Sequence, residues 1–239
     1  MDTAKYVTAK IYAGSGKKIN EVKQKNNVKG LNYLIWKLDE KSTHLPGAWI
    51  HEETRGIPVL PGRYKIVLSN GNDKDSSWIE VKADPRFSLR AEIDNELYAY
   101  RKDVDAEVER LADLLNKLDE KKALVDKIKQ RTIEDEKLTD EKRLAFSTIL
   151  DVLKVIRYKG QISRPDRQVG AWQSFEVSPY SKVKQALGVA AARLVPISEQ
   201  EKKVVEEARS LIDAFEKEVE RFNKNEWQIF ENKLDLIGN

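Results

Sequence analysis

The feature that most constrains the fold is a change of hydrophobic period at Asp84-Pro85-Arg86. Before this point apolar residues alternate with polar ones, as they do on a half-buried strand. After it they recur every three or four residues, as they do on one face of a helix. Because a segment patterned for one period does not fold stably with the other, we predict an α+β fold with a boundary after residue 86.

Five segments of the first part have the pattern of short strands. They are residues 6–13, 17–23, 31–38, 63–69 and 78–83. Turn signals separate several of them, namely Gly14-Ser15-Gly16, Leu60-Pro61-Gly62 and Asn70-Gly71. We expect residues 39–58 to form a long loop, and Trp36 and Trp78 to lie in the core. Short strands with such turns favour an immunoglobulin-like β-sandwich over residues 1–86.

Residues 87–239 have the pattern of helices. We predict long helices at about 88–130, 140–157 and 198–237, and a short one at about 182–194. Thr139 is the expected N-cap of the second, and Ser198 with Glu201 forms a capping box for the last. The expected apolar stripe of the last helix includes Val204, Ala208, Leu211 and Phe215. One stripe per helix indicates an antiparallel long-helix bundle. The same stripes could pack between chains.

Composition excludes several classes of function. The chain has no cysteine, which rules out a disulfide scaffold, thiolate zinc sites and a cysteine nucleophile. The net charge is +3, without the clustered positive charge along the chain that a nucleic-acid-binding protein needs, so we expect no nucleic-acid partner. No window approaches 18 apolar residues, and Met1-Asp2-Thr3-Ala4-Lys5 has no signal-peptide core, so we expect neither a membrane span nor a signal peptide. Nothing indicates a cofactor.

Four motifs of the first part carry a resemblance. They are Gly30-Leu31-Asn32, Trp36-Lys37-Leu38, Gly56-Ile57-Pro58-Val59-Leu60-Pro61-Gly62-Arg63-Tyr64 and Val81-Lys82-Ala83-Asp84-Pro85-Arg86. Together they resemble the immunoglobulin-like domain near the C-terminus of bacterial sortilin-like (VPS10-type) BNR-repeat β-propeller proteins, which are often labelled glycosyl hydrolases. They are also similar to the immunoglobulin-like module of the flagellar hook-capping protein.

The resemblance implies a helical tail after the sandwich, and the helix start at Pro196-Ile197-Ser198 agrees with it. It also implies a periplasmic or extracellular location, whereas a complete chain would be cytoplasmic. The chain departs from the family in three ways: the propeller is absent, the sandwich lacks a first strand, and Lys37 replaces a usual Asp. Any catalytic residues of the family's propeller therefore cannot be assigned to this chain.

The loop at residues 39–58 holds one group of candidate binding residues. His44 and His51, with Glu52 beside them, could ligate zinc, but their spacing in a Pro- and Gly-containing loop imposes no ligand geometry, so we expect a solvated loop and no metal site. Trp49, with both histidines and Arg55, could instead contact a sugar or peptide. The alternative is that Trp49 packs against the rest of the protein.

The irregular segment 161–175 holds a second group. Arg164, Arg167 and Trp172 are residue types that often anchor interfaces. The alternative is a crossover loop that packs over the helices.

The carboxylates of the helices alternate with lysine and arginine on polar faces, so we assign no catalytic residue and expect that the chain is not an enzyme. The function we expect is a non-catalytic accessory or interaction region of a larger propeller protein, which contacts another domain of that protein or a carbohydrate or protein ligand. The alternative is a free-standing structural or adaptor protein that self-associates through its long helices into a homo-oligomer.

Overall fold

The computed structural model describes residues 6–25, 30, 32–41, 56–85, 90–134, 138–161, 177–190 and 196–237. Within them an antiparallel sheet is combined with long helices, which is the predicted α+β class. The chain divides into two compact units. The sheet unit contains Met1–Thr43, Ile50–Lys102 and Arg193–Ile197, and the helical unit contains His44–Trp49, Asp103–Ala192 and Ser198–Asn239.

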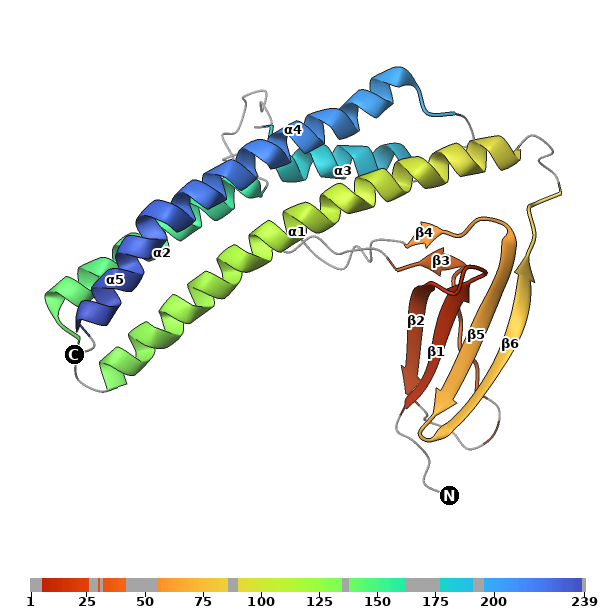
Figure 1. Ribbon diagram of the computed structural model, residues 1–239, viewed down its shortest axis with the longest axis horizontal. Coiled ribbons are helices and arrows are strands. Elements are labelled where there is room, and N and C mark those ends of the chain that lie inside the picture. Colours follow the sequence, from red (N-terminus) through yellow and green to blue (C-terminus); the bar gives the residue numbers. More distant parts are fainter. Residues whose placement is uncertain are drawn as a thin grey trace, which may run out of the picture. The chain divides into compact units, whose positions relative to one another are not determined.

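The sheet has four strands in the order β2-β1-β5-β6, and every neighbouring pair is antiparallel (Figure 1). Its strands are β1 (Tyr6–Ala13), β2 (Lys18–Lys25), β5 (Gly62–Asn70) and β6 (Asp73–Val81). Two short strands, β3 (Asp39–Glu40) and β4 (Ile57–Pro58), pair with each other separately. The prediction of one continuous loop over residues 39–58 was therefore wrong at both ends of that range.

The predicted strand over residues 31–38 was also wrong, because residues 32–37 lie in no strand. Leu38 has a φ of 57°, a left-handed backbone conformation that an extended strand cannot contain. The alternation was still informative, because Leu34 and Trp36 are half-buried and pack against the core of the sheet. The Trp36 indole Nε1 donates a hydrogen bond of 2.8 Å to the carbonyl oxygen of Asp39.

The two faces of the sheet differ because side chains alternate along each strand. The inner face carries Ala9, Ile11 and Tyr64, which are all buried. The outer face carries the residues between them, and Trp78 lies there because it pairs with Lys65. Trp78 is 49% exposed, so its prediction as a core residue was wrong.

Most of the helices lie where the 3.6-residue period predicted them. They are α1 (Arg90–Glu134), α2 (Asp140–Gly160), α3 (Pro179–Ala190), α4 (Glu199–Phe222) and α5 (Gln228–Ile237). The Thr139 N-cap and the capping box of Ser198 with Glu201 are both confirmed. The last helix was predicted as continuous, but a π-helical turn, η1 (Asn223–Trp227), separates α4 from α5.

The core of the helical unit consists of buried apolar side chains from α1, α2, α3, α4 and α5. On α4 the buried stripe runs one residue later than predicted at two positions, because Val205 and Ile212 are buried where Val204 and Leu211 were expected. Adjacent apolar residues satisfy the same helical period, so periodicity could not choose between them.

Ion pairs give the relative directions of the helices in this unit. On α1 and α4, Asp103 pairs with Arg209 and Arg110 with Glu216, so the two helices run parallel. Lys159 of α2 pairs with Glu218 of α4, and Lys182 of α3 pairs with Glu207. Phe146, near the start of α2, packs against Phe230 of α5, which follows α4 in the chain. Residue numbers therefore rise along α2 while they fall along α4 and α5, so α2 runs antiparallel to α4.

Candidate functional site

The candidate residues from the sequence all lie outside the described residues. This holds for His44, Trp49, His51 and Arg55 of the first loop and for Arg164, Arg167 and Trp172 of the second. Both binding hypotheses, and the preference for a solvated loop over a zinc site, therefore stay predictions. In the described part of the chain, no three His, Asp or Glu side chains lie together as a metal site would require. None of the described helices is apolar enough over a sufficient length to cross a membrane.

An open apolar groove lies on the inner face of the sheet and has a volume of about 300 Å³. We call it the inner groove. Its lining comes from β1, β2, β5 and the segment before β3, namely Val7, Ala9, Ile11, Gln24, Lys25, Asn32, Tyr33, Leu34, Trp36, Ile66 and Leu68.

Among the residues that the structure describes, the inner face is covered mainly at one end, and the inner groove lies beyond that cover. At the end near β3, Trp36 packs edge-on against Tyr64, with ring centroids 5.6 Å apart. Away from that end, Leu68 is 43% exposed and Tyr33 is 71% exposed. Contiguous exposed apolar side chains in a groove mark a surface that binds something, whereas scattered ones do not.

A buried carboxylate, Glu40 of β3, is the most enclosed acidic group of the sheet unit among the described residues. The side chain is 8% exposed. Its Oε1 accepts a hydrogen bond of 2.5 Å from the Tyr98 hydroxyl, and its Oε2 accepts one of 3.2 Å from the Lys102 amine. Both donors lie on the first turns of α1, within the same unit. Because each carboxylate oxygen has a donor, Glu40 fastens β3 to the start of α1.

This contact also changes the acidity of two phenols. Burial and the hydrogen bond to Glu40 raise the pKa of Tyr98 well above its ordinary value. Burial, with a smaller effect from the charge of Glu40, raises the pKa of Tyr64. Both phenols therefore stay protonated at neutral pH and act as hydrogen-bond donors. Sequence reasoning missed Glu40 because the position fell in a predicted loop.

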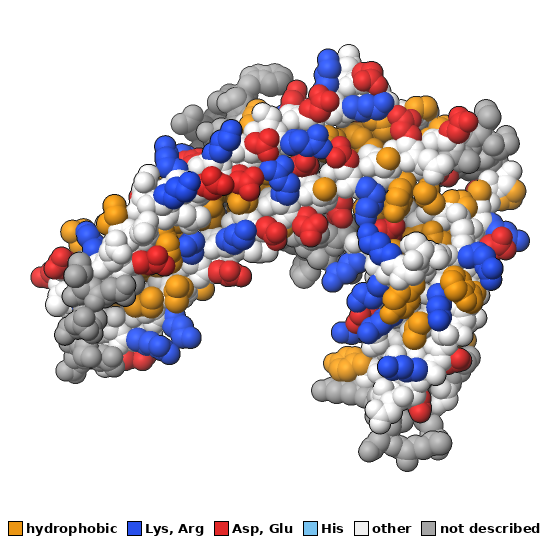
Figure 2. Space-filling view, viewed as in Figure 1, with side chains coloured by type: hydrophobic (Ala, Val, Ile, Leu, Met, Phe, Trp, Pro, Cys, Tyr) orange, Lys and Arg blue, Asp and Glu red, His pale blue; other side chains and the backbone are white. Residues whose placement is uncertain are grey.

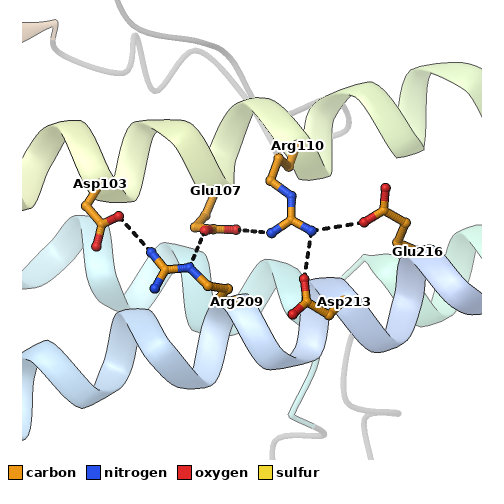
Figure 3. Close-up of polar contacts among 6 residues, drawn as sticks. All are labelled: Asp103, Glu107, Arg110, Arg209, Asp213 and Glu216. Atoms are coloured by element: carbon orange, nitrogen blue, oxygen red, sulfur yellow. Dashed lines mark hydrogen bonds and ion pairs between the residues drawn. The ribbon is translucent and has the colours of Figure 1, made fainter.

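A ladder of six charged residues joins α1 to α4 in the helical unit (Figure 3). The residues of this ion ladder are Asp103, Glu107, Arg110, Arg209, Asp213 and Glu216.

At the centre of the ion ladder, Glu107 is only 4% exposed. Its two oxygens accept hydrogen bonds of 2.9 Å from Arg110 and 2.7 Å from Arg209. The hydrogen bonds that both guanidinium groups donate to carboxylates raise the pKa of Arg110 and of Arg209, so both remain charged. With every carboxylate facing an arginine, the ion ladder sets the register of the two helices. Nothing in it resembles a catalytic pair of carboxylates across a cleft.

The π-helical turn carries a second unusual contact. The Lys121 amine lies 3.8 Å from the centroid of the Trp227 ring, and the Trp227 indole donates a hydrogen bond of 2.7 Å to Glu231. Burial lowers the pKa of Lys121. A cation over an indole face is a stabilising contact in its own right, so we assign this group to the packing of α1 against the end of α4.

Comparison with known proteins found no relative. No protein-family model matches the sequence, and neither a curated protein nor a solved structure gives a significant match. The function must therefore be argued from the inner groove and the surfaces around it.

Proposed function

We propose that this chain is a non-catalytic interaction region of a larger bacterial protein of the sortilin-like β-propeller type. In this proposal the inner groove receives apolar side chains from another domain of the same parent protein, in a periplasmic or extracellular location. The observation that carries the proposal is the open, apolar inner groove, because a surface of this kind gains free energy when it is covered.

Two observations support an immunoglobulin-like origin of the sheet. Strands β1 and β2 form one hairpin and β5 and β6 form another, and the two hairpins pair through their first strands, β1 and β5. One sheet of the immunoglobulin-like fold has the same order of strands. The Tyr64 hydroxyl donates a hydrogen bond of 2.6 Å to the carbonyl oxygen of Leu60, four residues upstream. Such a tyrosine contact at the start of a strand is a recurring feature of immunoglobulin-like sandwiches.

The position of the inner groove fits this origin. In a complete sandwich a second sheet covers the inner face. Among the described residues outside the four-stranded sheet, Leu34, Trp36 and Val59 pack against the core of that face, and β3 and β4 form a sheet of only two short strands. A sandwich with an incomplete second sheet would present such a groove to a neighbouring domain.

The proposal is tested by sequencing the gene upstream of the Met1 codon. It predicts a continuous reading frame that encodes a propeller. An in-frame stop codon directly before Met1 would contradict it. The non-catalytic part has a separate test, in which the purified chain is assayed on aryl-glycosides and sialosides, and sustained turnover would contradict it.

A second candidate function is self-association through the helices. One specific observation favours it: α2 carries exposed apolar side chains at Leu144, Val155 and Tyr158, which share one face of the helix. Leu144 is 67% exposed. Light scattering at several protein concentrations tests this candidate. A dimer that Leu144→Glu converts to a monomer would support it, and a monomer at every concentration would contradict it.

A further inference from the structure

We propose that the outer face of the sheet binds an acidic polysaccharide, that is, a sugar polymer with uronate or sulfate groups. This face lies opposite the inner groove, and the inference does not depend on the function proposed above. The register gathers basic side chains on the outer face, from all four strands: Lys10, Lys18, Lys23, Arg63, Lys65 and Lys74. Figure 2 shows Lys and Arg side chains over the strands, next to exposed hydrophobic ones.

The basic residues recur along the face in successive cross-strand rows. One row contains Tyr12, Lys65 and Trp78. The next contains Lys10, and the one after it contains Lys23 and Lys74 at its two edges. Rows on one face of a sheet are about 7 Å apart, because alternate residues share a face. A polymer with regularly repeated negative charges can therefore contact several rows at once.

Much of this positive charge is not neutralised by neighbouring carboxylates. Glu21 pairs with Lys18 and Lys23, each at 3.1 Å, and these two lysines lower the pKa of Glu21 to about 2. Among the described residues, Lys10, Lys65 and Lys74 have no carboxylate partner. Their charges are available to an anionic ligand, and the interaction would weaken as salt screens it.

The outer face also offers an aromatic surface for a sugar ring. Trp78 is half exposed on the edge strand β6, and the Arg63 guanidinium lies 5.4 Å from its ring centroid. The face of an indole is electron-rich, so it attracts the weakly positive C–H groups of a sugar ring. A stacked sugar would place its carboxylate or sulfate near Arg63 or Lys65.

The acidic residues of the outer face favour a polysaccharide over a nucleic acid. Glu21 and Glu80 both lie on this face. A carboxylate accepts hydrogen bonds from the free hydroxyl groups of a sugar polymer, whereas the deoxyribose-phosphate backbone of DNA has no such hydroxyl donors along the chain. Thr8, Ser69 and Ser76 on the same face add short hydroxyl groups that can hydrogen-bond to a sugar.

The test is a calorimetric titration of the full chain with polygalacturonate and with dextran sulfate. Neutral dextran and single-stranded poly(dT) serve as comparison ligands. We expect binding to at least one acidic polysaccharide that decreases with salt, weaker binding to poly(dT), and none to neutral dextran. The double variant Lys10→Gln with Lys65→Gln should bind at least about tenfold more weakly, and Trp78→Ala should show a loss of similar size.

A matched control removes the same charge elsewhere. Lys127→Gln with Lys203→Gln changes two exposed lysines of α1 and α4, and it should leave binding within about twofold of the unaltered chain. Circular dichroism confirms that each variant is folded. The inference is overturned if neither acidic polysaccharide binds, if poly(dT) binds at least as tightly, or if the control variant loses as much affinity as the outer-face variant.

Discussion

The helical unit and the sheet unit bury their apolar side chains to different extents. In the helical unit, Leu115 of α1, Val183 of α3 and Ile212 of α4 are completely buried, and the stripes continue along each helix. In the sheet unit, the buried core of the four-stranded sheet is confined to Ala9, Ile11, Ile19 and Tyr64 among the described residues, beyond which the inner groove begins. The comparison shows that the helical unit buries apolar stripes along its helices, whereas the sheet leaves part of its apolar inner face exposed.

The largest expected effect is the cost of removing a core side chain from the helical unit. Phe146→Ala removes a ring that is buried against Phe230 and should lower the free energy of unfolding by about 3–5 kcal/mol. In the sheet unit, Leu68→Ala should cost less than about 1 kcal/mol, because Leu68 is already half exposed. Urea denaturation followed by circular dichroism measures both values. Equal costs would contradict the comparison.

Two glycines extend the comparison of the helical unit with the sheet unit. Each unit has one glycine against which other atoms pack so closely that a Cβ would not fit. A Cβ at Gly160 would lie 2.4 Å from the Phe215 ring, and one at Gly56 would lie 2.1 Å from the Glu40 carbonyl oxygen. Gly160→Ala and Gly56→Ala should each cost about 1–3 kcal/mol in thermal or urea unfolding.

The control for this pair is Gly188 of α3, where a Cβ would meet nothing within 4 Å. Gly188→Ala should raise stability by about 0.5–1 kcal/mol, because alanine favours a helix. A destabilising effect at Gly188 would show that the observed costs do not come from close packing.

The ion ladder should contribute a smaller but measurable part of the stability. Glu107→Gln weakens hydrogen bonds to two partly exposed arginines and should cost about 1–3 kcal/mol. Asp126→Asn, which removes an exposed pair with Lys122, should cost less than about 0.5 kcal/mol. A double-mutant cycle of Glu107→Gln with Arg209→Gln isolates the coupling. A coupling energy near zero would remove the register role of Glu107.

The smallest expected effect is a pH dependence in the sheet unit. The pKa of Tyr98 is raised in the folded state, so its phenol ionises first in the unfolded chain. The stabilisation is therefore complete below the unfolded pKa of about 10 and decreases as the pH rises above it. Tyr98→Phe should make the loss of stability above about pH 10 less steep. Urea midpoints at a series of alkaline pH values measure this, and an unchanged slope would contradict it.

The sequence predicted those parts of the fold that depend on local periodicity and capping. The strand Tyr6–Ala13 and the helix starts at Thr139 and Ser198 are examples, because alternation and capping side chains act within a few residues. It failed where the outcome depends on distant contacts. The short strands β3 and β4 pair across the segment between them, and no local pattern specifies that pairing.

The surfaces were harder to predict than the elements. The sequence predicted Trp78 as a core residue, whereas the pairing of β5 with β6 places it beside Lys65 on the outer face. Charge counted along the chain likewise concealed the concentration of lysines there. Glu40 and Glu107 were indistinguishable in the sequence from solvated carboxylates until their partners on other elements were known.

The central claim is that the inner groove is an open apolar surface able to bind a partner. A titration with a hydrophobic fluorescent dye, 8-anilinonaphthalene-1-sulfonate, tests it most directly. The account predicts that the chain binds the dye, that Leu68→Glu abolishes most of this binding, and that Ser69→Glu, on the adjacent outer-face position, does not. Absence of dye binding, or binding that Leu68→Glu leaves unchanged, would contradict the claim.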